Sequence, residues 1–100
     1  MSESRTAEDV PLPGGNFRLL IQKLGYQGLM SLGLIENPIT GEAHRDLGHA
    51  RMLIDDLAMI ADKTRGNLDE DEAEHLEKTL SDLRHHFDTV SREDAASASE

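Results

Sequence analysis

The sequence predicts an all-α fold, in which an antiparallel hairpin of two helices carries a shorter first helix packed on it. Apolar residues recur at alternating intervals of three and four along residues 47–64 and again along 73–90. This spacing places them on one face of an α-helix. Only a short polar stretch separates the two segments, so their apolar stripes should pair. A third apolar segment, residues 16–32, precedes them, and the whole forms either a three-helix bundle or part of a helical dimer.

The first helix is expected from about Asn16 to Leu32. Asn16 is a suitable N-cap, because its side chain can accept a hydrogen bond from a free backbone N–H of the first turn. Gly25 and Gly28 each lower helix propensity by up to ~1 kcal/mol relative to alanine. Two glycines three residues apart also allow another backbone to come close. The apolar residues at helical spacing are Phe17, Leu20, Ile21, Leu24 and, widening the face, Tyr26, Leu29 and Met30.

The second helix follows a turn at residues 36–41 and ends near Arg65, with Thr40 or Asp46 as its capping residue. Its main stripe consists of Leu47, Ala50, Ile54, Leu57, Ala61 and Thr64. A second apolar set lies beside this stripe and consists of Met52, Leu53, Met59 and Ile60. A helix that packs on one neighbour needs only the first set, so this helix is expected to contact two partners.

The boundary before the third helix carries the strongest local signals. Gly66 suits the left-handed position after a helix. Asp69 as N-cap places Glu72 where a reciprocal capping box needs an acid, with Leu68 and Ala73 placed as a hydrophobic staple. The stripe of the third helix consists of Ala73, Leu76, Leu80, Leu83, Phe87 and Val90.

The composition suggests one helical domain between two tails. Residues 1–15 and 93–100 are rich in small, polar and acidic residues, or in proline and glycine, and have little to bury. We therefore expect a disordered N-terminal tail over 1–15, a helical domain over 16–92 and a disordered acidic tail over 93–100.

Charge and residue content exclude several classes of function. The chain of 100 residues has a formal net charge of −10, and residues 67–91 alone contribute −6 from eight acids and two bases. An acidic chain is a poor ligand for bare nucleic acid. The absence of cysteine removes disulfides, thiolate metal sites and cysteine nucleophiles. No apolar run approaches the ~20 residues that a membrane-spanning helix requires, and the N-terminal residues lack the pattern of a signal peptide.

The histidines raise a metal hypothesis that the spacing does not complete. Glu72 and His75 form an ExxH step, the spacing used in di-iron bundles, but such sites need a second ExxH and two further glutamates. The pairs Asp46–His49 and Asp82–His85 share this spacing and fall on polar faces. Because the ligand set is incomplete, we predict no metal site, and we predict no cofactor. We also predict no catalytic residue, since no serine or threonine has a recognisable base partner. A metal-binding protein or metal-dependent enzyme using His and Glu side chains is the alternative.

Apolar residues on the first helix and on the second face of the second helix exceed what one hairpin can cover. We therefore predict a non-enzymatic interaction protein, a homodimer or a module for another protein partner. A further alternative is association of the first helix with a membrane surface through Arg18 and Lys23. The predicted interaction face consists of Phe17, Leu20, Ile21, Leu24, Leu29, Met52, Leu53, Met59 and Ile60.

Four short segments of the sequence resemble a known bacterial family. They are residues 33–42 (GLIENPITGE), 53–57 (LIDDL), 63–68 (KTRGNL) and 80–84 (LSDLR). In order and spacing they are similar to the domain of unknown function 1844, over roughly residues 17–90. Glu36 stands where that family often has proline. The resemblance implies a small, mostly helical, cytoplasmic bacterial protein, and it brings no established activity and no catalytic motif.

Overall fold

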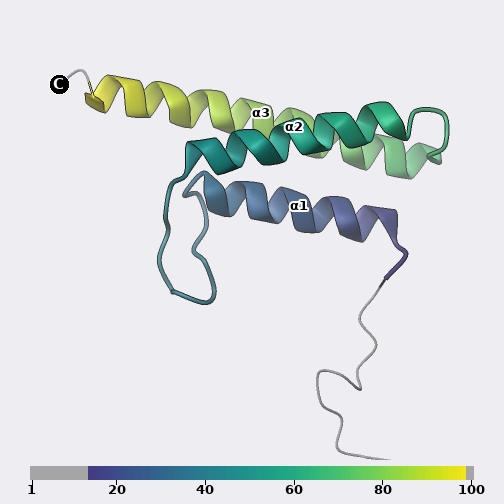
Figure 1. The fold of residues 1–100 in the computed structure, drawn as a ribbon, viewed down its shortest axis with the longest axis horizontal. Coiled ribbons are helices and arrows are strands. Elements are labelled where there is room, and N and C mark those ends of the chain that lie inside the picture. Colours follow the sequence, from purple (N-terminus) through teal and green to yellow (C-terminus); the bar gives the residue numbers. More distant parts are fainter. Residues whose placement is uncertain (1–13, 99–100) are drawn as a thin grey trace, which may run out of the picture.

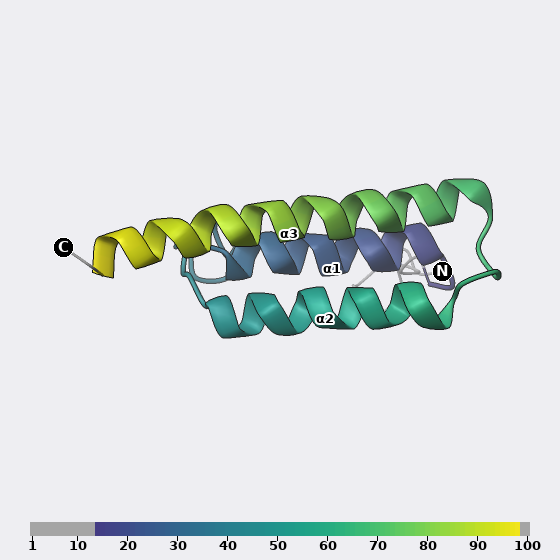
Figure 2. The same ribbon diagram turned by 90° about the horizontal axis from the view of Figure 1, so that it is seen from above.

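A computed structural model describes residues 14–98, and this part of the chain forms a bundle of three helices (Figure 1). They are α1 (Phe17–Ser31), α2 (Leu47–Lys63) and α3 (Glu70–Ala98). The helices α1 and α3 run in the same direction and α2 runs in the opposite one, and each helix packs against the other two (Figures 1 and 2). The predicted all-α class is confirmed, and the first helix folds back on the hairpin of its own chain.

Side-chain caps set where the first two helices begin. The Oδ1 atom of Asn16 accepts a hydrogen bond from the backbone N–H of Leu19 at 3.1 Å. In the same way Oδ1 of Asp46 accepts from the N–H of His49 at 3.0 Å. Asp46, and not Thr40, is therefore the cap of α2.

The structure confirms the capping box and the left-handed glycine that the sequence predicts before α3. Asp69 Oδ1 accepts from the N–H of Glu72 at 2.8 Å, and Glu72 Oε1 accepts from the N–H of Asp69 at 3.0 Å. This is the reciprocal capping box. Gly66 has φ of +89°, the left-handed conformation that favours glycine. One detail differs, because Ala73 is exposed and the buried stripe of α3 begins at Leu76.

The core is aliphatic and lies between all three helices. The helix α2 contributes to it from both of its apolar sets, because α1 covers one side of α2 and α3 covers the other. The double width of this face is thus explained within one chain. The buried apolar residues are Ile21, Leu32, Ala50, Leu53, Ile54, Leu57, Leu76, Leu80, Leu83 and Val90.

Two glycines set the distance between α1 and α3. A Cβ atom at Gly28 would lie 2.8 Å from Leu83 Cδ2 and 2.9 Å from Leu83 Cδ1, and one at Gly25 would lie 2.9 Å from Thr79 Cγ2. These separations are shorter than van der Waals contact, so a larger residue fits only if the side chain of Leu83 or Thr79, or α3 itself, moves. The low helix propensity of the two glycines is the cost of this close packing.

The loop between α1 and α2 is closed at its base. The N–H of Asp46 donates to the carbonyl oxygen of Ser31 at 2.7 Å, and Leu32 and Arg45 form an isolated antiparallel bridge beside this bond. Gly33 has φ of +74°, and a Cβ there would lie 3.3 Å from Arg45 Cβ, so this position favours glycine for both reasons. The residues beyond this base form a loop that projects from the end of the bundle (Figure 1).

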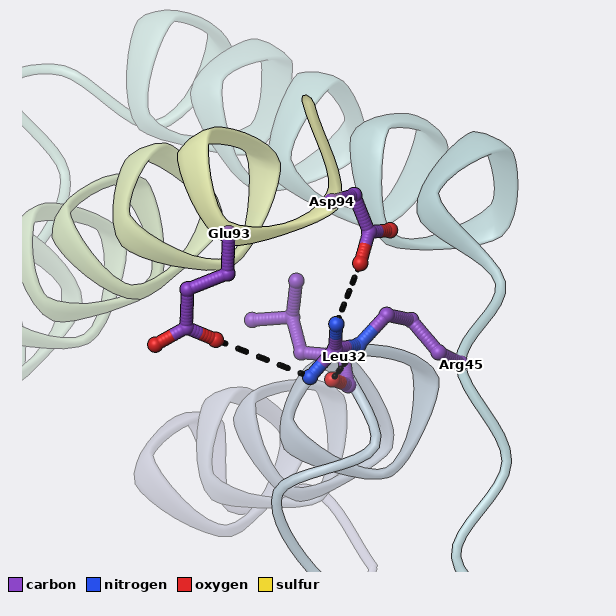
Figure 3. A network of polar contacts seen from close by, with 4 residues as sticks. All are labelled: Leu32, Arg45, Glu93 and Asp94. Atoms are coloured by element: carbon purple, nitrogen blue, oxygen red, sulfur yellow. Dashed lines mark hydrogen bonds and ion pairs between the residues drawn. The ribbon is translucent and has the colours of Figure 1, made fainter. Parts of the chain in front are cut away.

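The helix α3 is longer than the sequence predicted. We expected an irregular tail from residue 93, but α3 continues to Ala98 and its end projects beyond the other helices (Figure 2). Arg45 holds this extension, since its guanidinium donates to Leu32 O at 3.3 Å, pairs with Asp94, and lies 3.8 Å from Glu93 Oε1 (Figure 3). The acids that read as a disordered tail thus pair with a distant arginine. The prediction for the N-terminal tail falls mainly on residues 1–13, outside the described residues.

Replacing Gly28 by alanine is expected to destabilise the bundle although alanine is the better helix former. Overpacking of a core typically costs 1–3 kcal/mol, which exceeds the ~1 kcal/mol gained in propensity. We expect a net loss of about 1 kcal/mol in the free energy of unfolding, measured by urea denaturation followed by circular dichroism.

Gly48→Ala is the matched control, because Gly48 is exposed on α2 and a Cβ there would meet only Asp46 Oδ1 at 3.6 Å. This variant should be as stable as the wild type or more stable, by up to ~1 kcal/mol. Equal stabilisation by both substitutions would contradict the close packing of α1 on α3.

Replacing Arg45 by alanine should loosen α3 after Val90. Without the guanidinium, Glu93 and Asp94 lose their cation, and the projecting turns of the helix have little other packing. Hydrogen exchange of the amides of residues 91–98 should become several-fold faster, while exchange at Leu80 and Leu83 stays unchanged. Arg51→Ala, which removes only the exposed i,i+4 pair with Asp55, should leave α3 unaffected.

A candidate interaction surface on the first helix

The structure divides the predicted interaction face into buried and exposed parts. Ile21 and Leu53 are 0% and 3% exposed and lie inside the bundle, so their assignment to an outer face is wrong. Four further residues are partly buried and pack against the core, and three are well exposed. The partly buried ones are Phe17, Leu24, Leu29 and Ile60, and the exposed ones are Leu20, Met52 and Met59.

The exposed methionines of α2 do not form a continuous apolar surface. Met52 and Met59 lie seven residues apart on the outward side of the helix and are 46% and 49% exposed. Their neighbours at helical spacing include the exposed carboxylates of Asp55 and Asp56 and the ammonium of Lys63. Charged groups therefore separate the two side chains, and single exposed apolar residues are ordinary on protein surfaces.

The outer face of α1 is different, because its exposed residues are apolar, cationic or, at Gln22, an uncharged amide, and none is acidic. Leu19 and Tyr26, 39% and 50% exposed, lie seven residues apart on the side opposite the buried Ile21. Leu20, 44% exposed, is adjacent, and Lys23 lies between them. We call Leu19, Leu20, Lys23 and Tyr26 the α1 face.

The electrostatic character of the α1 face contrasts with that of the whole chain. The helix α1 contains no aspartate or glutamate, whereas the chain has twenty acids against ten bases. Arg18 and Lys23 are both exposed, and neither forms an ion pair with another residue of the described range 14–98. The face is thus a small apolar and basic region on an acidic protein.

Each end of the α1 face carries a distinctive feature. At the N-terminal end a surface hollow of about 440 Å³ is lined by residues 14–17 together with Leu19, Leu20 and Lys23. At the C-terminal end stands the projecting loop, whose Ile39 is 91% exposed. The loop extends on the side of α1 that faces away from α2 and α3 (Figures 1 and 2).

The acids of the predicted His-and-acid pairs have structural roles. Asp46 and Glu72 cap α2 and α3, and Asp82 accepts a hydrogen bond from Lys78 Nζ at 3.1 Å. Within residues 14–98 no group of three or more His, Asp or Glu side chains could hold a metal ion. The Nδ1 atom of His75 is buried between α1 and α3 and finds no hydrogen-bond partner in that range.

Four exposed apolar residues lie outside the predicted interaction face, namely Leu19, Tyr26, Leu34 and Ile39. Leu19 lies off the stripe of α1, and periodicity selects the residues that face the core. Ile39 stands in a turn beside Pro38, where an aliphatic residue has no helical face to join. The sequence signal for Ile39 is that it is an isolated aliphatic residue within a turn rich in helix-breaking residues.

Comparison with known proteins supports the family resemblance and adds no activity. A family model described as a domain of unknown function (DUF1844) matches residues 15–88. Neither the curated proteins nor the solved structures contain a match to this chain. Among residues 14–98, no helix has the length and apolar character needed to cross a membrane.

Proposed function

The chain belongs to this DUF1844 family, and we propose that it is a non-enzymatic interaction module that self-associates through the α1 face. One observation carries the proposal: the α1 face exposes Leu19, Leu20 and Tyr26 around Lys23, with no carboxylate among them. Three large apolar side chains together on a small protein form the kind of patch that marks a binding surface.

The proposed partner is a second copy of the chain, related by a two-fold axis. A two-fold axis across α1 makes the two helices antiparallel and presents the same patch from both copies. With the axis near Gln22 and Lys23, Leu19 of one copy lies opposite Tyr26 of the other. The tyrosine ring then packs on an aliphatic side chain, while its hydroxyl stays at the wet edge of the contact.

Charge supports this choice of surface. Two chains of net charge −10 repel each other, and the outer sides of α2 and α3 carry most of the acids. The α1 face allows two copies to meet without apposing carboxylates. Lys23 can extend its ammonium to the edge of the contact while its methylene groups cover the neighbouring leucines. The two cations are few for a membrane-surface helix on so acidic a body, which disfavours that alternative.

Replacing Leu19 by aspartate is expected to convert a dimer into a folded monomer. The change places an uncompensated carboxylate in the apolar contact twice, once from each copy. Sedimentation equilibrium should show the wild type as a dimer at micromolar concentration and Leu19→Asp as a monomer. Circular dichroism should show equal helix content, because Leu19 is not part of the core.

Met52→Asp is the control, since Met52 is similarly exposed on α2 but lies outside the α1 face. It should remain a dimer with the affinity of the wild type. A wild type that is monomeric up to high micromolar concentration would contradict the proposal. So would binding of that monomer to anionic phosphatidylserine vesicles, which would favour the membrane surface instead.

A further inference from the structure

We propose that the loop between α1 and α2 completes this dimer interface, with Ile39 of each copy seated in the hollow at the N-terminal end of α1 of the other. This inference rests on the proposed self-association. In this arrangement the projecting loop is an interaction element. Its acidic side chains face the basic N-terminal end of α1 in the second copy.

The exposure of Ile39 is the first observation. At 91% it is far more exposed than the other large apolar residues of residues 14–98, which reach at most 50%. The energetic cost of leaving a whole isoleucine side chain in water is about 1.5–3 kcal/mol relative to burial. Burial of this side chain against a second molecule would remove that cost, so Ile39 is suited to bind a partner.

The loop tip is held in one conformation by its own hydrogen bonds. The N–H of Asn37 donates to Glu42 O at 3.0 Å, and the N–H of Gly41 donates to Asn37 O at 2.7 Å. Asn37 Oδ1 also accepts from the N–H of Ile39 at 2.8 Å. Because the turn is already ordered, docking Ile39 costs little conformational entropy.

The position of the loop matches the position of the hollow under two-fold symmetry. The loop stands at the C-terminal end of α1 and extends past the outer side of that helix (Figure 1). The hollow lies at the N-terminal end of the same face. Antiparallel pairing of two α1 helices brings the C-terminal end of each beside the N-terminal end of the other. Both loops then reach both hollows at once.

Charges at the two ends are complementary in this arrangement. The loop carries Glu36 and Glu42, both exposed. In the N-terminal half of α1, Lys23 lines the hollow, whereas Arg18 lies toward α3 in a separate surface hollow with Asp71 and Glu74. None of these four side chains has an ion-pair partner among the residues that the structure describes. The exchange of loops between the two copies places Glu36 and Glu42 of one copy beside Lys23 of the other, and it also compensates the approach of the two Lys23 side chains.

The area that a stable dimer must bury also favours a contribution from the two loops. A stable dimer typically buries ~800 Å² on each partner. Contact between the two α1 helices buries the outer sides of Leu19, Leu20 and Tyr26 of each copy. The two loops add Ile39 and its surroundings at both ends of the helix pair.

A charge-swap experiment tests the assignment. Arg18→Glu/Lys23→Glu makes both the loop and the α1 face acidic, whereas Glu36→Lys/Glu42→Lys makes both basic. Each variant alone should dimerise at least tenfold more weakly than the wild type. An equimolar mixture should form a heterodimer with affinity within about threefold of the wild type, since both loop contacts regain opposite charges. Native mass spectrometry distinguishes the species.

The outcomes separate the two proposals. A wild-type dimer with no preference for the heterodimer would overturn the loop contact and leave the pairing of the α1 helices standing. A monomeric wild type would overturn both. If residues 1–13 of the same chain filled the hollow instead, the charge swap would leave dimerisation unchanged.

Cysteine pairs give a second, geometric test in a chain that has no cysteine of its own. In Leu20→Cys/Ile39→Cys, position 20 lies about 17 Å along the helix from Ser31, where α1 ends, and position 39 lies in the loop beyond that end. Mild oxidation should give a covalent dimer with two bridges. Ile39→Cys alone should give none, because the two loops lie at opposite ends of the dimer. Bridging by the single variant would contradict the arrangement.

Discussion

Where α1 lies against α3, Gly25 and Gly28 contribute no side chain, and the side chains of Thr79 and Leu83 of α3 pack against the backbone of α1. This contact fixes the rotation of α1 about its own axis. Ile21 then points into the core, and Leu19 and Tyr26 must point away from it, because residues on a helix are separated by about 100°. The α1 face is therefore a consequence of the glycine contact.

Local signals predicted the helices well. Asn16, the Asp69–Glu72 capping box and Gly66 each act through backbone groups a few residues away, so the sequence contains all that is needed to recognise them. The end of α3 could not be predicted in this way. Its last turns depend on Arg45, which is 49 residues distant from Asp94, and no periodicity reports such a contact.

The candidate surface was only partly predictable for a related reason. An apolar pattern identifies which residues prefer burial, but it does not say whether the same chain or another one buries them. The pattern places Leu53 and Ile21 in the predicted interaction face, yet the folded chain covers them by itself. Leu20 was found, while Leu19 and Ile39 were missed because both lie outside the periodic stripe. On a small bundle, candidate interaction residues are the apolar residues that lie outside the periodic stripe and stay exposed.

The proposed contact between two α1 helices can be tested directly through Tyr26, the only tyrosine in the chain. In a sample that mixes isotope-labelled and unlabelled chains, filtered NMR spectra report only contacts between copies. The account predicts intermolecular cross-peaks from the Tyr26 ring to the methyl groups of Leu19. A dimer that lacks these cross-peaks, or that shows contacts from the methyl groups of Met52 and Met59 instead, would contradict it.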